Sequence, residues 1–180
     1  MYPFPSASHP EAAKPSTPLR MMVFAIADYF FALPINVVLK VVNCPPLLLS
    51  SSLSSIELVH LGLHTITLLK LQQHLAPGQL QQQANTAQFL VVTQLVQQEL
   101  CAILVDAPPN LIEIPLSAIR TLPESYRQAH PLHKIASHIA VLPQEETSLS
   151  IFLLDMEQVL KTLTRSLAQV PEELTSVVRS

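Results

Sequence analysis

Short apolar runs, each soon stopped by proline or by a polar turn, are the feature that most constrains the fold of this 180-residue chain. The runs are rich in Val, Ile, Phe and Tyr, which favour strands. They cover residues 21–31, 35–43, 56–61, 65–71, 87–96, 99–105, 111–114, 134–142 and 148–154. About nine or ten short strands with turn signals between them are typical of a sandwich or a barrel. The sequence therefore predicts a mostly β protein.

A glutamine-rich segment separates the strand runs into two sets. Residues 72–85 hold six glutamines and the pair Pro77-Gly78, and we interpret them as a loop or a ragged helix. We therefore expect the split between two subdomains near residues 72–86. The runs 21–31 and 35–43 are apolar on both faces. This is expected when one face lines a barrel and the other meets a neighbouring subdomain.

One helix is predicted, close to the C-terminal end. Asp155 can cap it, with Gln158 as the partner in a capping box, and Pro171 limits its length. Its apolar stripe consists of Met156, Val159, Leu160, Leu163 and Leu167, which recur at helical spacing. Residues 1–19 contain five prolines and are predicted to be a flexible tail. Residues 169–180 are expected to form a second tail.

Glycine is scarce, and this excludes several functions. Gly62 and Gly78 are the only two glycines, where average usage of about 7% would give roughly a dozen. Loops that cradle phosphates need several glycines at fixed spacing, so nucleotide chemistry is disfavoured. The net charge is −3 and no basic run is present. Nucleic acid is therefore not an expected partner.

The stretch 21–39 is apolar enough to need a test as a membrane span. Asp28, Pro34 and Asn36 interrupt it, whereas a spanning helix needs about 20 consecutive apolar residues, so no membrane span is expected. Cys44 and Cys101 lie far apart in the sequence. Two isolated cysteines suit a reducing compartment, and we expect a cytoplasmic protein. A disulfide between the two cysteines remains an alternative on the sequence alone.

Side chains that could carry catalysis are few. Neighbouring carboxylates occur at 145–146 and 172–173, in segments that are expected to be exposed. His130, His133 and His138 form the alternative of a His-based metal site, without an accompanying cysteine. Ordinary surface histidines are the simpler interpretation. We assign no catalytic, cofactor or metal residue, and the pattern favours a protein-interaction module over an enzyme.

Four segments, taken in order, resemble the CheW-like domain family. They read FAIADYFFALPINVVLKVV at 24–42, VHLGLHTITLLKLQQHL at 59–75, ELCAILVDAPPNLIEIPLSAIRTLPESYR at 99–127 and SIFLLDMEQVL at 150–160. The third contains Val105-Asp106 and Ile119-Arg120, as in the family block. The sequences of segments 59–75 and 102–127 are most similar to those of CheW-like proteins of cyanobacteria. The resemblance covers residues 21–165, and we expect the domain to occupy residues 20–168.

This resemblance implies a fold and a role. The fold is a CheW-like pair of five-stranded SH3-like β-barrel subdomains with a C-terminal helix. The role is that of a non-catalytic adaptor in chemotaxis or motility signalling. Its expected partners are the regulatory domain of a CheA-type histidine kinase and the tip of a methyl-accepting chemoreceptor, which the adaptor would hold in one array.

The family pattern also points to residues that would bind partners. Val38 and Lys40 fall at family contact positions, although Val38 could equally belong to the core. The family commonly has Asn-x-Arg-Gly in the turn where this chain has 60–63, so Gly62 and Leu63 stand in place of Arg and Gly. The acid that usually precedes the next leucine is Lys70. These departures suggest a different receptor or a weaker receptor contact. The alternative is a CheW-like regulator of another kinase without receptor coupling.

Overall fold

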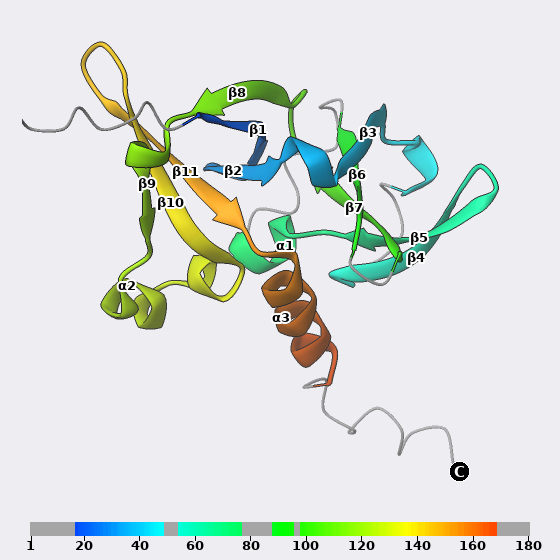
Figure 1. Ribbon diagram of the computed structural model, residues 1–180. Helices are drawn as coiled ribbons and strands as arrows, with labels where there is room; N and C mark the ends of the chain where they lie inside the picture. The colour runs from blue at the N-terminus through cyan, green and yellow to red at the C-terminus, as the bar shows by residue number, and fades with distance from the viewer. Residues whose placement is uncertain (1–16, 49–53, 77–87, 96–97, 169–180) are drawn as a thin grey trace, which may run out of the picture.

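The computed structural model describes residues 17–48, 54–76, 88–95 and 98–168. The first of its two sheets contains β1 (Leu19–Ile26), β2 (Tyr29–Pro34), β8 (Asn110–Ile114), β9 (Ile119–Thr121), β10 (Ala136–Pro143) and β11 (Ser148–Leu154). The second contains β3 (Val38–Asn43), β4 (Ile56–Leu61), β5 (His64–Leu69), β6 (Phe89–Gln94) and β7 (Leu100–Val105). The strand orders are β8-β1-β2-β11-β10-β9 and β3-β6-β7-β5-β4, and Figure 1 shows the sheets side by side.

Helices and turns fill the connections. The α-helices are α1 (Gln72–Leu75), α2 (Glu124–Ala129) and α3 (Met156–Ala168), and short 3₁₀ turns span Ile35–Val37, Pro46–Leu48, Leu116–Ala118 and Pro131–Lys134. None of the helices in the described segments is both long and apolar enough to cross a membrane. The predicted tails lie almost wholly outside the described residues.

The expected split near residues 72–86 is wrong, because the sheets do not divide the chain there. β5 precedes this segment and β7 follows it, and the two strands pair in parallel within one sheet, Leu68 opposite Ala102. The six-stranded sheet instead joins the two ends of the described chain, since β2 and β11 also pair in parallel, with Phe31 opposite Phe152. The middle of the chain, from β3 to β7, forms the five-stranded sheet.

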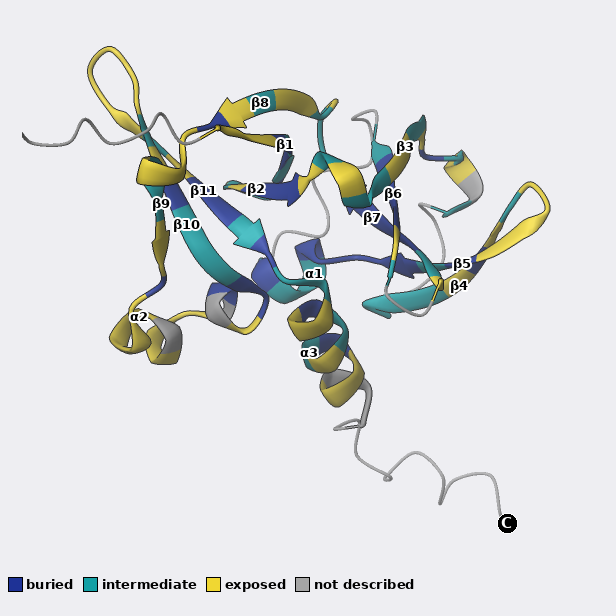
Figure 2. Cartoon of the chain, viewed as in Figure 1, coloured by how far each residue is buried: buried dark blue, intermediate teal, exposed yellow. Residues whose placement is uncertain are grey.

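Three clusters of buried side chains explain why so many strands are apolar on both faces. One cluster lies within the six-stranded sheet and includes Met21 and Ile151. A second lies within the five-stranded sheet and includes Leu104. The third and largest contains side chains from both sheets and from α3, among them Ile103 and Val159. Neighbouring residues of one strand, such as Ile103 and Leu104, therefore enter different cores, as strand alternation requires. The central strands are buried accordingly (Figure 2).

The first apolar run is a hairpin rather than one strand. Residues 21–31 turn at 27–28 between β1 and β2, with Met21 opposite Pro34. Ala27 has a φ of 52°, which is uncommon for any residue other than glycine, asparagine or aspartate. The sequence carries no glycine signal at this turn. A contact from the other sheet holds it instead, because the carboxylate of Asp106 accepts a hydrogen bond from the N–H of Ala27.

Two further predictions need correction in the second half of the chain. Residues 117–133, which hold none of the predicted strand runs, contain β9 and α2. β9 pairs with β10, Arg120 opposite Ile139, so one sheet has six strands instead of the expected five. α3 begins as predicted, with the N–H groups of Glu157 and Gln158 donating to Asp155 Oδ1. The capping box is incomplete, since the N–H of Asp155 donates to the carbonyl of Ile135.

Candidate interaction surfaces

Two of the predicted contact residues lie on β3, at one edge of the five-stranded sheet. Val38 pairs with Thr93 and Lys40 pairs with Val92, so the ladder has a bulge at Leu39. The bulge leaves the Leu39 side chain 52% exposed, while the Val38 side chain packs partly against the shared core. Lys40 is exposed. We call residues 38–40 the bulge surface, whose outward apolar group is Leu39.

The other two predicted contact residues form the tip of the β4–β5 hairpin. Leu61 pairs with His64, so Gly62 and Leu63 make a two-residue turn. Gly62 has a φ of 64°, and a Cβ built on it meets no atom within 4 Å. A positive φ at the first turn residue alone is the pattern of a type II′ turn, in which glycine is preferred. The Leu63 side chain is fully exposed, as the colour of this tip in Figure 2 shows.

The outer face of the same hairpin adds a residue that sequence reasoning missed. Leu58 is 73% exposed and lies opposite Thr67, while the next outward residue, His60, lies opposite Thr65. The His60 Nδ1 and Thr65 Oγ1 atoms are 3.2 Å apart. We call residues 58, 60 and 63 the hairpin surface. It contains two solvent-exposed leucines, and clustered exposed apolar side chains mark interaction sites.

The structure does not bring the bulge surface and the hairpin surface together. β3 and β4 are the two ends of the strand order β3-β6-β7-β5-β4, so three strands separate them. At about 4.8 Å per strand, β3 and β4 lie about 19 Å apart when measured across the strands of the sheet. The two surfaces are therefore two separate contact regions on one framework rather than one continuous patch.

Lys70 has a structural partner and does not face a binding region. Its Nζ atom lies 2.7 Å from Glu57 Oε2, and only 7% of the Lys70 side chain is exposed. Its backbone N–H donates to the carbonyl of Ser55, continuing the β4–β5 ladder. Lys70, which stands where the family has an acid, is therefore paired with a carboxylate on the neighbouring strand. The substitution at this position leaves the outer surface of the hairpin unaffected.

A groove on the six-stranded barrel is the third candidate region, with a volume of about 590 Å³. Its walls come from the start of β2, from β10 and β11, and from the segment leading into α2. The lining residues are Asp28, Tyr29, Phe30, Leu122, Pro123, Tyr126, Ile139, Ser148, Leu149, Ser150 and Phe152. None of the predicted contact residues lines it, so sequence reasoning missed this region.

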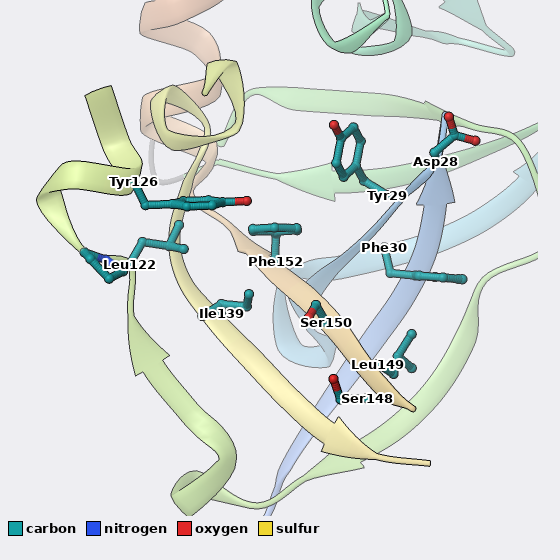
Figure 3. A pocket seen from close by; sticks show the side chains of 11 residues that line it. Asp28, Tyr29, Phe30, Leu122, Tyr126, Ile139, Ser148, Leu149, Ser150 and Phe152 are labelled. Carbon is teal, nitrogen blue, oxygen red and sulfur yellow. The ribbon is translucent and has the colours of Figure 1, made fainter. Parts of the chain in front are cut away.

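Aromatic rings dominate this groove. Tyr29 packs edge-on against Phe152, with 6.2 Å between ring centroids. In Figure 3 the hydroxyl end of Tyr126 points toward Phe152, and Phe30 lies beside Leu149 on the other side of β11. Tyr126 also stacks on His130, with ring centroids 5.5 Å apart. Phe30 is 43% exposed and Tyr126 is 37% exposed, so these rings are available to a ligand.

The histidines proposed as an alternative metal set have other contacts. His130 stacks on Tyr126, and the Nδ1 atom of His138 lies 2.9 Å from Ser137 Oγ. The His133 side chain is outside the described residues. Among the side chains that the structure describes, no group of three or more His, Cys, Asp or Glu is placed to hold a metal ion.

The family model of the CheW-like domain matches residues 20–164. The comparison with curated proteins found no match. Among solved structures, the crystal structure of the scaffolding protein TtCheW from Thermoanaerobacter tengcongensis is similar, with 18% identity and a TM-score of 0.58 over 83% of this chain and 91% of that one. At this identity the likeness concerns the fold, and it confirms the predicted pair of SH3-like barrels.

Proposed function

The chain belongs to the CheW-like domain family, and from this premise we propose that it is a non-catalytic adaptor between a CheA-type histidine kinase and methyl-accepting chemoreceptors. The observation that carries the proposal is the pair of exposed apolar groups at opposite edges of one sheet. Leu39 projects from the bulge surface and Leu63 from the hairpin surface. A protein that holds two partners at once needs two such regions on a framework that does not deform between them.

The mechanism we propose is positioning rather than chemistry. A receptor that changes conformation can bias a kinase only if the two are held in a fixed relation, and the energy comes from differential contacts in the two states. The five-stranded sheet supplies that fixed relation. We assign the hairpin surface to the receptor tip, because Gly62 and Leu63 occupy the turn where the family has its Arg-Gly pair. Lys40 and Leu39 form the second contact, to the kinase regulatory domain, in the cytoplasm.

A second function is favoured by one specific feature of this chain. The hairpin tip has Gly62 where the family commonly has a basic side chain, so a receptor that is recognised through a carboxylate would lose a charge-assisted hydrogen bond there. On this alternative the chain regulates another kinase through its bulge surface and has no receptor coupling.

A reconstituted signalling complex separates the two functions. The cognate kinase, the receptor and the full chain are mixed, and kinase autophosphorylation is measured with and without each component. The adaptor proposal expects the receptor to change kinase activity only when the chain is present. Binding to the kinase without any receptor effect would support the alternative. Absence of binding to any CheA-type kinase would contradict both.

A further inference from the structure

The groove of the six-stranded barrel has the chemistry of a site for a proline-rich peptide. Tyr29, Phe30, Tyr126 and Phe152 supply aromatic surfaces from three different segments. Aromatic grooves bind proline rings, and segments already in the polyproline II conformation lose little entropy when they dock. Among the lining residues, all within the described part of the chain, Asp28 is the only charged one. An anionic ligand is therefore disfavoured, whereas an apolar segment is favoured.

This chain carries a segment with that composition. Residues 1–16 contain Pro3, Pro5, Pro10 and Pro15, which restrict the backbone toward polyproline II. The aromatic residues Tyr2 and Phe4 alternate with the first two prolines, and Lys14 is the one lysine or arginine of the segment. The rings at the N-terminal end of the segment match the aromatic walls of the groove, whereas Lys14 lies too far along the chain to meet Asp28 when those rings fill it.

We propose that the groove binds the proline-rich N-terminal segment of the same chain. The distances allow it. β1 begins at Leu19 and spans about 23 Å to Ile26 at 3.3 Å per residue, and the turn that follows β1 forms part of the groove wall. Residues 5–16 cover about 37 Å in polyproline II at 3.1 Å per residue. Tyr2–Pro5 can therefore reach the groove from the start of β1.

Because the segment belongs to the same chain, even a weak intrinsic affinity would give substantial occupancy of the groove. A short flexible link gives the second binding event an effective concentration in the millimolar range. A peptide that binds the free groove with a dissociation constant of about 1 mM would therefore occupy it roughly half of the time when attached. Occupation of the groove by residues 1–5 would close this surface to any competing partner. It would leave the bulge and hairpin surfaces on the other barrel open.

A spin label on the N-terminal segment of the full chain tests the proposal. A nitroxide is attached after Ser8→Cys, and the broadening of backbone amide signals is measured by NMR. Cys44 and Cys101 are buried, so the introduced thiol reacts first. We expect strong broadening at Tyr29 and Ser150, with several-fold weaker broadening at Leu58 and Leu63 on the other barrel. Equal broadening at both places would overturn the proposal.

Two substitutions test the chemistry of the contact, with a matched control. The pair Tyr2→Ser and Phe4→Ser changes only the N-terminal segment and cannot unfold the barrels, and it should abolish the selective broadening. Tyr126→Ala should do the same from the groove side. Leu116→Ala removes a side chain of similar exposure outside the groove and should leave the broadening unchanged. Persistence of selective broadening in the Tyr2 and Phe4 variant would contradict the proposal.

A mixed sample distinguishes the same chain from a second copy. Isotope-labelled protein without the nitroxide is combined with unlabelled protein that carries it. Attachment within one chain predicts no selective broadening at Tyr29 and Ser150 in this mixture. Broadening there would show that the segment of a second copy fills the groove, and it would overturn the assignment to the same chain.

Discussion

The carboxylate of Asp106, at the end of β7, accepts a hydrogen bond of 2.7 Å from the backbone N–H of Ala27 in the β1–β2 turn. The two residues belong to different barrels. The other carboxylate oxygen lies 3.1 Å from Gln72 Nε2 and 3.4 Å from Gln88 Nε2. One side chain thus ties the turn of the six-stranded barrel to both ends of the β5–β6 connection. It also supports a turn whose next residues, Asp28 and Tyr29, line the groove.

Replacing Asp106 by asparagine should destabilise the protein by about 2 kcal/mol, because hydrogen bonds to a charged group contribute about 1.5–3 kcal/mol. The asparagine amide would also point a donor at groups that are themselves donors. Urea unfolding measures the loss. Asp155→Asn is the matched control, since asparagine caps helices nearly as well as aspartate, and its effect should stay within about 0.5 kcal/mol. Equal stability of the two variants would contradict the role given to Asp106.

Gly62→Ala should cost about 1 kcal/mol through backbone strain alone. The φ of 64° is unfavourable for alanine, whereas a Cβ at this position meets open space. Gly62→Asn should recover much of the loss, because asparagine tolerates this conformation better. Thermal unfolding of both variants checks the order. If the alanine variant is as stable as the native chain, the turn geometry described for Gly62 and Leu63 is wrong.

The Glu57–Lys70 pair should respond unequally to loss of either partner. Glu57→Gln leaves a buried ammonium group without its carboxylate and should cost more than about 1 kcal/mol, the upper range for exposed pairs, approaching the about 3–5 kcal/mol of buried ones. Lys70→Met removes the buried charge and leaves a partly exposed carboxylate, so its cost should be smaller. Chemical denaturation of both variants gives the comparison. A larger loss of stability for Lys70→Met than for Glu57→Gln would contradict this expectation.

The buried thiols should make stability fall at high pH. Burial raises the pKa of Cys101 from 9.0 to about 11, and the carboxylate of Glu99 adds to the shift. Burial also raises the pKa of Cys44, although Lys70 opposes this. A raised folded pKa means that the thiol contributes stability below the unfolded pKa, and that this contribution is lost as the pH rises toward about 11.

Unfolding measured between pH 8 and about 11 tests this account of Cys101. Cys101→Ala removes the titrating thiol, so its stability should decline less steeply with pH than that of the native chain. The native thiols should also react slowly with an aromatic disulfide reagent near pH 8 and rapidly once the protein is unfolded. Identical pH slopes for the two proteins would show that the Cys101 thiol is not linked to folding.

The sequence pattern predicted strands and helices well where the signal came from residues that are neighbours in the chain. The hairpin β4–β5, the strands β6, β7 and β11, and the start of α3 at Asp155 all lie close to their expected positions. The β1–β2 turn was missed, because Ala27 adopts a positive φ through a contact with Asp106 that is 79 residues away. The parallel pairs β2–β11 and β5–β7 were missed for the same reason. Strand periodicity shows which residues are buried but not which strand lies beside them.

The candidate surfaces also differ in how far the sequence alone could predict them. Gly62 marked the turn that exposes Leu63, since one of only two glycines stood between two β-prone runs. The exposure of Leu39 depends on a bulge in the pairing with β6, and nothing in the run 35–43 distinguishes it from its partly buried neighbours. Val38 packs partly against the shared core, so a charge at this position would damage folding as well as binding. Leu39 is the better site for a test.

The proposed adaptor role is tested by the affinity of the full chain for the regulatory domain of its cognate CheA-type kinase, measured by isothermal titration calorimetry. We expect binding that Leu39→Asp weakens at least tenfold, a loss of about 1.4 kcal/mol. The folded control Leu116→Asp should bind like the native chain, since Leu116 is similarly exposed on the other barrel. No binding of the native chain, or equal binding of the two variants, would contradict the claim that this protein is an adaptor using its bulge surface.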